Sequence, residues 1–387
     1  MPTGDARRVL GFRSARGVAD GLAAVLLPAH LVALGFSAAQ VGLVSTLSLV
    51  GSAAATLSLP VLARTWTRRR LLMAAAVLMA ATGAGFGLAA ALPVLAVVAF
   101  IGTANPTGGD VSVFVPVEQA VLSQTAADRD RTALFARYAL VGALSLAAGS
   151  AAAGLVPPRA AFVLYGAVGL GGLAVYHRLS AAAEVPVAVR SGLGPSRSIV
   201  LRLTALFAVD SFGSGFAGQS ILVLWLFARF GLSVTAAGLI LFWTGLATSA
   251  SMLASPVLAR RIGLVRTMAF THIPANLFLV AAALVPRVEL AVALLLARAL
   301  LSTMDVPART SYVMAVVTAP ERTAAAAVTG VARSLAAVPG PVLAGLLLDA
   351  GHRRWPLVLA GSIKVVYDLA LLAAFGRVPA PEEEEVV

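Results

Sequence analysis

The sequence predicts an all-α membrane protein with twelve transmembrane helices in two pseudo-symmetric bundles of six. Three observations support this fold: long apolar runs, arginines concentrated in alternate connections, and an internal repeat. Of the 387 residues, 59% are hydrophobic and 12% are charged, whereas soluble domains are about 45–50% apolar and about 25% charged. The apolar excess lies in runs of about 20 residues, the length that crosses a bilayer as a helix.

The apolar runs define the expected spans one by one. The basic stretch at 1–17 precedes a run without a signal-peptide cleavage site, so we expect a retained first helix. The predicted spans are 14–35, 37–63, 69–90, 92–124, 131–154, 158–179, 199–229, 233–260, 264–285, 288–317, 321–348 and 355–376.

Arginines distinguish the two sides of the membrane. One set of connections carries Arg7, Arg8, Arg13, Arg16, Arg64, Arg68, Arg69, Arg70, Arg129, Arg131, Arg178, Arg190, Arg197, Arg260, Arg261, Arg266, Arg322 and Arg377. The opposite set carries Arg159, Arg229, Arg287, Arg353 and Arg354. The positive-inside rule places the richer set, and with it both termini, in the cytoplasm. The same rule explains the net charge of +12, so we expect a lipid bilayer of the inner (plasma) membrane as partner and no nucleic acid.

The two halves of the chain resemble each other. GFSAAQVGL at 35–43 matches GLSVTAAGL at 231–239, an offset of 196. Later the offset is 191, at which Pro116 matches Pro307 and Tyr176 matches Tyr367. The repeat predicts bundles at 1–179 and 199–377, a cytoplasmic linker at 180–198 and an acidic tail at 378–387. In such parallel repeats the substrate site lies between the halves near the membrane midplane.

The segment DVPARTSYVMAVVTAPERTAAAAVTGVARSLAAVPGPVLAG at 305–345, with its counterpart at 110–137, resembles the major facilitator superfamily, in its efflux-like branches. The resemblance covers nearly the whole length. It implies a transporter that works by alternating access, with spans 1, 4, 7 and 10 around the cavity. Arg64 and Arg260 fall on the basic frame that the family carries after the second span of each half, and we expect them at the cytoplasmic gate.

Carboxylates inside predicted spans are candidates for proton coupling, because a buried charge is costly and tends to be functional. We expect this role for Asp110, Asp20, Asp210 and Asp305. Asp110 follows Pro and Gly residues that predict a broken helix, whose local hydrogen bonding is the alternative. For Asp20, placed about 6 residues into its helix, and for Asp210, an ion pair is the alternative.

Cationic and polar residues in the later spans are candidates for binding substrate. We assign this role to Arg309, Arg298, Arg333 and Gln219. Asp305 and Arg309 are four apart and can pair on one helical face.

The repeat places Glu118 opposite Arg309, so these two form a candidate gate between the halves; static packing is the alternative. Lys364 and Asp368, also four apart, predict a neutral pair within the last helix. Gly142, Gly149 and Gly154 are assigned to close helix packing.

The resemblance to the efflux branches implies a secondary transporter that exports a small organic molecule, and the buried carboxylates make protons the expected coupling ion; we expect a monomer. One alternative is proton-coupled uptake of an anionic metabolite through the arginines. Another is a membrane sensor on the same scaffold that transports nothing. The sequence has no cysteine, its four histidines lack metal-ligand spacing, and no nucleophile–base constellation is visible. We therefore expect no enzyme activity, no metal and no cofactor.

Overall fold

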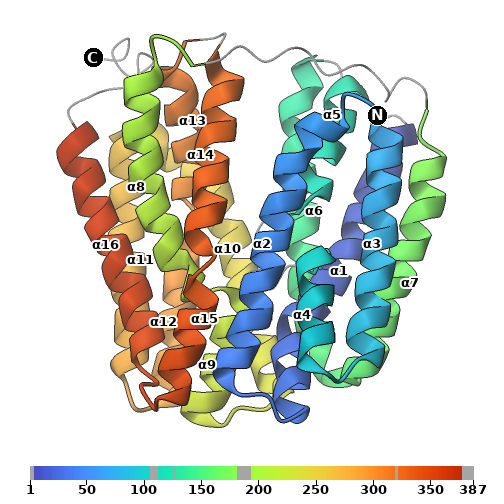
Figure 1. Ribbon diagram of the computed structural model, residues 1–387. Coiled ribbons are helices and arrows are strands. Elements are labelled where there is room, and N and C mark those ends of the chain that lie inside the picture. Colours follow the sequence, from blue (N-terminus) through green and yellow to red (C-terminus); the bar gives the residue numbers. More distant parts are fainter. Residues whose placement is uncertain (1–3, 105–111, 126–127, 181–192, 319–320, 377–387) are drawn as a thin grey trace. The chain divides into compact units, whose positions relative to one another are not determined.

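The computed structural model describes residues 4–104, 112–125, 128–180, 193–318 and 321–376, and every regular element among them is helical (Figure 1). The chain forms two compact units. Unit 1 consists of Met1–Ala188 with Gly218–Phe242, and unit 2 of Val189–Ala217 with Trp243–Val387. The predicted bundle boundaries at 179 and 199 remain a prediction.

The protein is a multi-pass membrane protein. Eleven helices among the described residues are long and apolar enough to cross a bilayer. The fourth predicted span, 92–124, contains α4 (Leu92–Ile101) and α5 (Phe114–Thr125), and residues between them lie outside the described ranges. The number twelve therefore remains a prediction, whereas the all-helical, multi-span architecture is confirmed.

Unit 1 is built around its first helix. Besides α4 and α5, the other elements of this unit are α2 (Ala38–Leu62), α3 (Arg68–Leu88), α6 (Asp128–Ala152), a short 3-10 turn (Ala153–Leu155), α7 (Pro158–His177), α9 (Gln219–Phe230) and the start of α10 (Val234–Ile262). The first helix, α1 (Gly4–Ala33), packs against α2, α5, α6, α7 and α9. It begins ten residues before its predicted start at 14, because the arginines that precede the apolar run are part of the helix.

Small residues allow α1 and α6 to approach closely. A Cβ atom at Gly21 would lie 2.0 Å from the backbone oxygen of Leu146, and one at Gly149 would lie 2.1 Å from that of Val18. Neither position has room for a side chain, which supports the packing role assigned to Gly149.

Unit 2 has two central helices. Its elements are α8 (Arg197–Gly215), the rest of α10, α11 (Leu264–Leu284), α12 (Val288–Leu301), α13 (Asp305–Val316), α14 (Arg322–Ala337), α15 (Gly340–Asp349) and α16 (Trp355–Phe375). Helix α8 packs against α14, α15 and α16, and α11 packs against α12, α13 and α16. The predicted span 288–317 consists of two helices, with an interruption at Ser302. The predicted span 321–348 also consists of two helices, with an interruption at Val338.

Carboxylates hold the described ends of the predicted linker. Asp5 accepts hydrogen bonds from the backbone N–H of Ser180 at 3.1 Å and from its hydroxyl at 2.5 Å. At the other end Glu321 accepts from the backbone N–H groups of Gly194 and Ser196, the latter at 3.0 Å. Hydrogen bonding, first from the Ser196 hydroxyl and then from these backbone groups, lowers the pKa of Glu321 from its ordinary value.

Candidate functional site

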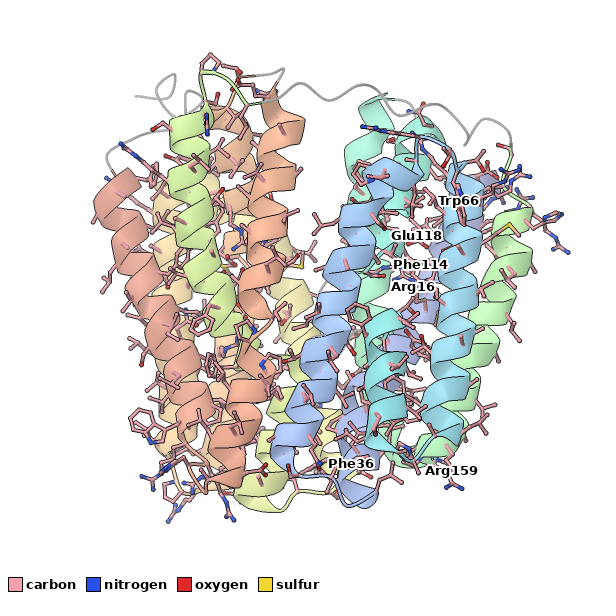
Figure 2. The ribbon with its side chains drawn as sticks, in the orientation of Figure 1. Arg16, Phe36, Trp66, Phe114, Glu118 and Arg159 are labelled. Atoms are coloured by element: carbon pink, nitrogen blue, oxygen red, sulfur yellow. The ribbon has the colours of Figure 1, made fainter. Side chains whose placement is uncertain are left out.

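Unit 1 contains a buried ion pair between α1 and α5. Arg16 Nη2 lies 2.7 Å from Glu118 Oε2, and the two side chains are almost completely buried. Tyr138 donates a short hydrogen bond to the same oxygen, and Tyr176 donates to Oε1 at 2.6 Å. The Arg16 guanidinium also lies 4.6 Å from the centre of the Phe114 ring; Figure 2 labels Arg16, Phe114 and Glu118 side by side. Both carboxylate oxygens are satisfied, the condition under which a buried pair is tolerated.

Asp20 lies further along its helix than the sequence predicts. It is sixteen residues beyond Gly4, the start of α1, or roughly 24 Å along the helix at 1.5 Å per residue. The predicted depth of about 6 residues is wrong because α1 includes the arginines before it. Its Oδ2 lies 4.0 Å from Arg16 Nη1, so the ion-pair alternative has a geometric basis. Its coupling role remains a prediction.

The Arg13 side chain extends from α1 toward α6 and lies next to Gly142. Its guanidinium lies 4.9 Å from the centre of the Tyr138 ring. A Cβ atom at Gly142 would lie 2.3 Å from Arg13 Nε, so a side chain there would displace this guanidinium.

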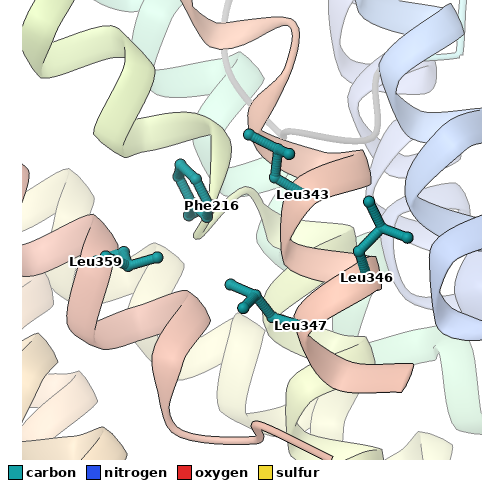
Figure 3. A pocket seen from close by; sticks show the side chains of 5 residues that line it. All are labelled: Phe216, Leu343, Leu346, Leu347 and Leu359. Atoms are coloured by element: carbon teal, nitrogen blue, oxygen red, sulfur yellow. The ribbon is translucent and has the colours of Figure 1, made fainter. Parts of the chain in front are cut away.

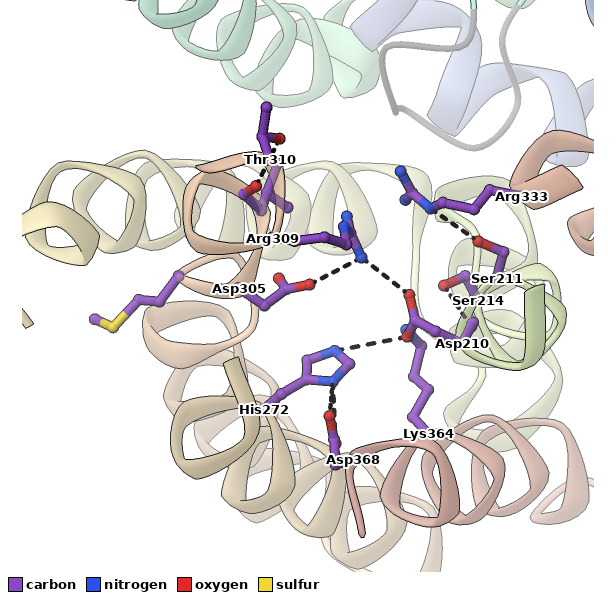
Figure 4. A network of polar contacts seen from close by, with 12 residues as sticks. Asp210, Ser211, Ser214, His272, Asp305, Arg309, Thr310, Arg333, Lys364 and Asp368 are labelled. Carbon is purple, nitrogen blue, oxygen red and sulfur yellow. Dashed lines mark hydrogen bonds and ion pairs between the residues drawn. The ribbon is translucent and has the colours of Figure 1, made fainter. Parts of the chain in front are cut away.

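Asp210 is the centre of a second buried network, in unit 2 (Figure 4). Lys364 Nζ donates to Asp210 Oδ1 at 2.6 Å. Arg309 Nη1 lies 3.4 Å from Asp210 Oδ2, and His272 Nε2 lies 3.9 Å from Oδ1. Helices α8, α11, α13 and α16 therefore meet at one carboxylate.

The same histidine contacts a second carboxylate. His272 Nδ1 lies 2.9 Å from Asp368 Oδ1, and Asn276 Nδ2 donates to Asp368 Oδ2 at 3.3 Å. The predicted pair of Lys364 with Asp368 is replaced by pairs with other helices, because α8 and α11 bring a partner to each of them.

The predicted pair at the start of α13 is confirmed. Asp305 Oδ2 lies 3.1 Å from Arg309 Nη1. Asp305 stands in the first turn of α13, where the helix dipole also stabilises a negative charge. Arg309 thus bridges two carboxylates, Asp305 and Asp210.

The other predicted substrate residues are divided between the units. In unit 2, Arg333 Nε donates to Ser211 Oγ at 3.2 Å, and Arg298 interacts electrostatically with Asp210 while its buried Nε has no hydrogen-bond partner. Gln219 begins α9 in unit 1, and its Oε1 is buried without a hydrogen-bond partner. The structure therefore groups the three arginines around Asp210 in unit 2, whereas Gln219 belongs to unit 1.

The predicted gate residues have partners in their own units. Glu118 is bound by Arg16, Tyr138 and Tyr176 in unit 1, and Arg309 by Asp210 and Asp305 in unit 2. A Glu118–Arg309 pair would require both sets of contacts to open.

The predicted gate residues Arg64 and Arg260 are exposed, one in the turn after α2 and the other in the last turn of α10. Figure 2 places Trp66, in the same turn as Arg64, and Arg159 at opposite ends of unit 1. The turn that holds Arg64 and the residue Arg159 therefore lie at opposite ends, which agrees with the assignment of these two arginines to opposite sets of connections. Asp110 lies outside the described residues.

An apolar cavity of about 320 Å³ lies in unit 2. Its lining consists of Phe216, Leu343, Leu346, Leu347 and Leu359 (Figure 3). None of these side chains can bind a charged group. Within the described ranges, no cluster of three His, Asp or Glu side chains is arranged to hold a metal ion.

Sequence reasoning missed Arg16 and His272. Arg16 precedes the apolar run and was assigned to a cytoplasmic connection, although its spacing of four from Asp20 was a signal of a shared helical face. His272 was treated as one of four scattered histidines. The sequence pattern that indicates a role for His272 is weaker: Asn276 follows it by four residues and so lies on the same helical face.

Comparison with known proteins identifies the family. Over 95% of its length the chain is 24% identical to the uncharacterized membrane protein YJR124C of Saccharomyces cerevisiae, 93% of which is covered. The nucleoside transporter NupG has a similar structure, with a TM-score of 0.76 and 14% identity over 96% of this chain and 99% of NupG. A D-xylose–proton symporter gives a TM-score of 0.74 and 13% identity over 97% of this chain and 98% of the symporter. Residues 14–302 match the Major Facilitator Superfamily, and the chain belongs to this family of transporters.

Proposed function

We propose that this protein is a proton-coupled secondary transporter that moves a small organic molecule across the plasma membrane by alternating access. The observation that carries the proposal is the buried network in unit 2, where His272 lies between the carboxylates of Asp210 and Asp368. A membrane-buried cluster of ionisable groups is costly to maintain, and in transporters such clusters form ion pathways and proton relays. The D-xylose–proton symporter, a protein of similar fold, supports the proton as coupling ion.

For the direction of transport we propose export, as the resemblance to efflux branches suggests. Proton-coupled export requires that proton and substrate bind in alternation. A cationic or neutral substrate that contacts Asp210 fits this requirement, because protons and cations compete for the same negative charge.

Uptake of an anionic metabolite is the second candidate. It is favoured by Arg298, whose buried Nε has no hydrogen-bond partner, and by Arg333, whose Nε binds only a serine hydroxyl. A buried guanidinium that makes no direct contact with a carboxylate is stabilised by an anion. In this case the proton and the anion bind together and move inward together.

Proteoliposomes that contain a pH-sensitive dye test the function. A pH gradient is imposed, and amphipathic cations and organic anions are added separately, with Asp210→Asn as the loss variant. Proton flux that depends on a cation and moves opposite to it supports export, and flux that accompanies an anion supports uptake. If folded wild-type protein gives no flux with either panel, the proton-coupled transporter is contradicted and the sensor alternative is favoured.

A further inference from the structure

His272 faces a carboxylate with each of its ring nitrogens. Nδ1 lies 2.9 Å from Asp368 Oδ1, and Nε2 lies 3.9 Å from Asp210 Oδ1. A neutral imidazole has one N–H donor and one acceptor nitrogen. When Nδ1–H donates to Asp368, the neutral ring presents the lone pair of Nε2 to a carboxylate. Only the protonated ring presents N–H groups to both carboxylates.

The ring is held in this orientation. Asp368 is completely buried and accepts hydrogen bonds from both His272 and Asn276. Asn276 follows His272 by four residues, so the two side chains lie on one face of α11. The Tyr367 ring packs edge-on against the imidazole, with 6.1 Å between ring centres. These contacts fix Nδ1 on Asp368 and leave Nε2 directed at Asp210.

The charged groups around His272 come from five helices. They are Asp210 on α8, Arg298 on α12, Asp305 and Arg309 on α13, Arg333 on α14, and Lys364 and Asp368 on α16. Three of these seven side chains are carboxylates and four are cations. The region therefore has one surplus positive charge when His272 is neutral and two when it is protonated.

We propose that His272 is the residue that carries the coupled proton, and that Asp368 and Asn276 are its positioning residues. The proposal rests on the proposed function and names the proton site within it. The proton binds at Nε2, where the new N–H faces the Asp210 carboxylate at 3.9 Å, and leaves from the same atom. Because Lys364 and Arg309 also bind Asp210, protonation of His272 adds a third positive partner to one carboxylate and loosens the hold of the other two.

The charge balance gives the sign of coupling. Protonation of His272 raises the positive charge of the region, which strengthens the binding of an anion and weakens the binding of a cation. Coupling between two sites is reciprocal, so an anion that binds near the arginines promotes proton uptake by His272. The site then favours movement of an anion together with the proton, or of a cation in exchange for it.

Proton binding can be measured without a substrate. Full-length protein with ¹⁵N-labelled histidine is placed in lipid nanodiscs, and its imidazole signals are recorded from pH 5 to 8. The chain has four histidines, each with two ring nitrogens, so His272→Gln removes one pair of imidazole signals and assigns it. We expect the assigned signals to report a change in the protonation of His272 within this range, and Asp368→Asn to alter that response because it removes the partner of Nδ1. If His272→Gln does not fold, single Gln variants of His30, His177 and His352 assign the signal by elimination.

The matched control is His30→Gln. His30 is the other histidine buried within a spanning helix, and it packs against the ring of Phe162, 5.3 Å away between centres. We expect the His272 titration to be unchanged in this variant. A His272 signal that does not change between pH 5 and 8, or that does not respond to Asp368→Asn, overturns the proposal.

Transport separates this proposal from the function on which it rests. With a compound that drives proton flux in wild type, His272→Gln should keep substrate exchange across liposomes without a pH gradient and should lose gradient-driven accumulation. His30→Gln should keep both. If the wild type gives no flux while His272 titrates, the transporter function fails and the proton site remains. If His272→Gln still accumulates substrate against its gradient, the proton site fails and the transporter function remains.

Discussion

Lys364 Nζ lies 2.6 Å from Asp210 Oδ1, which joins the last helix of the chain to the first helix of unit 2. Both side chains are buried. A buried ion pair is stable only while both partners are present, because either charge alone bears the full cost of desolvation.

Asp210→Asn should therefore both destabilise the protein and abolish transport. Removal of one partner of a buried pair costs about 3–5 kcal/mol, and here the change leaves Lys364 without its carboxylate. We expect a lower melting temperature in detergent and at least a tenfold loss of coupled flux in proteoliposomes.

The double variant Asp210→Asn with Lys364→Met separates the two effects. It removes the unpaired cation, so we expect much of the melting temperature to return while flux remains absent. Recovery of flux together with stability would show that Asp210 only serves packing.

The two units place a buried ion pair at corresponding helices, with the charges exchanged. Glu118 on α5 and Arg309 on α13 are 191 residues apart, the offset of the repeat. Glu118 pairs with Arg16 of α1, and Arg309 pairs with Asp210 of α8. The repeat predicted that these two positions correspond. It did not predict their partners, because Arg16 and Glu118 are 102 residues apart and no local pattern connects them.

The Arg16–Glu118 pair should stabilise unit 1. Glu118→Leu leaves the Arg16 guanidinium buried, with Asp20 as its nearest carboxylate at 4.0 Å. We expect a fall in melting temperature that corresponds to about 3–5 kcal/mol. Thermal unfolding of the purified protein measures it.

A double-mutant cycle provides the control. Arg16→Met with Glu118→Leu replaces the pair by apolar groups, which is often close to neutral. The double variant should therefore be more stable than the sum of the two single losses predicts. Additive losses would show that the two side chains act independently.

Spacing of four residues predicted one pair correctly and one wrongly. Asp305 and Arg309 do pair, at 3.1 Å. Lys364 and Asp368 have the same spacing, yet Lys364 binds Asp210 and Asp368 binds His272. Spacing shows which side chains share a helical face, but partners on neighbouring helices compete for them. Most span boundaries among the described residues, in contrast, were predictable within a few residues because apolar length is a local property of the sequence. The start of α1 at Gly4 is the exception, since polar residues before the apolar run continue the helix.

The close approach of α1 and α6 can be tested with one methyl group. Gly149→Ala would place Cβ 2.1 Å from the backbone oxygen of Val18, so the helices must move apart. Overpacking of this kind costs about 1–3 kcal/mol, and we expect a lower melting temperature. Gly171→Ala in α7 is the matched control, because a Cβ there meets nothing within 4 Å and alanine is the better helix former. Equal effects of the two variants would contradict the packing role of Gly149.

Glu321 should make the attachment of α8 depend on pH. Hydrogen bonding lowers the pKa of Glu321 in the folded protein, with the Ser196 hydroxyl as the first contributor. A carboxyl group whose pKa is lower in the folded state stabilises it above the pKa of the unfolded chain, about 4.3 for glutamate. That stabilisation is lost as the pH falls through the lower, folded value. We expect Glu321→Gln to melt below wild type at pH 7 and the difference to shrink as the pH falls below about 4.

Glu289→Gln, which changes an exposed glutamate in the first turn of α12, is the control for a general loss of negative charge. If the difference between wild type and Glu321→Gln is the same at both pH values, the ionised carboxylate does not hold Gly194 and Ser196 in place.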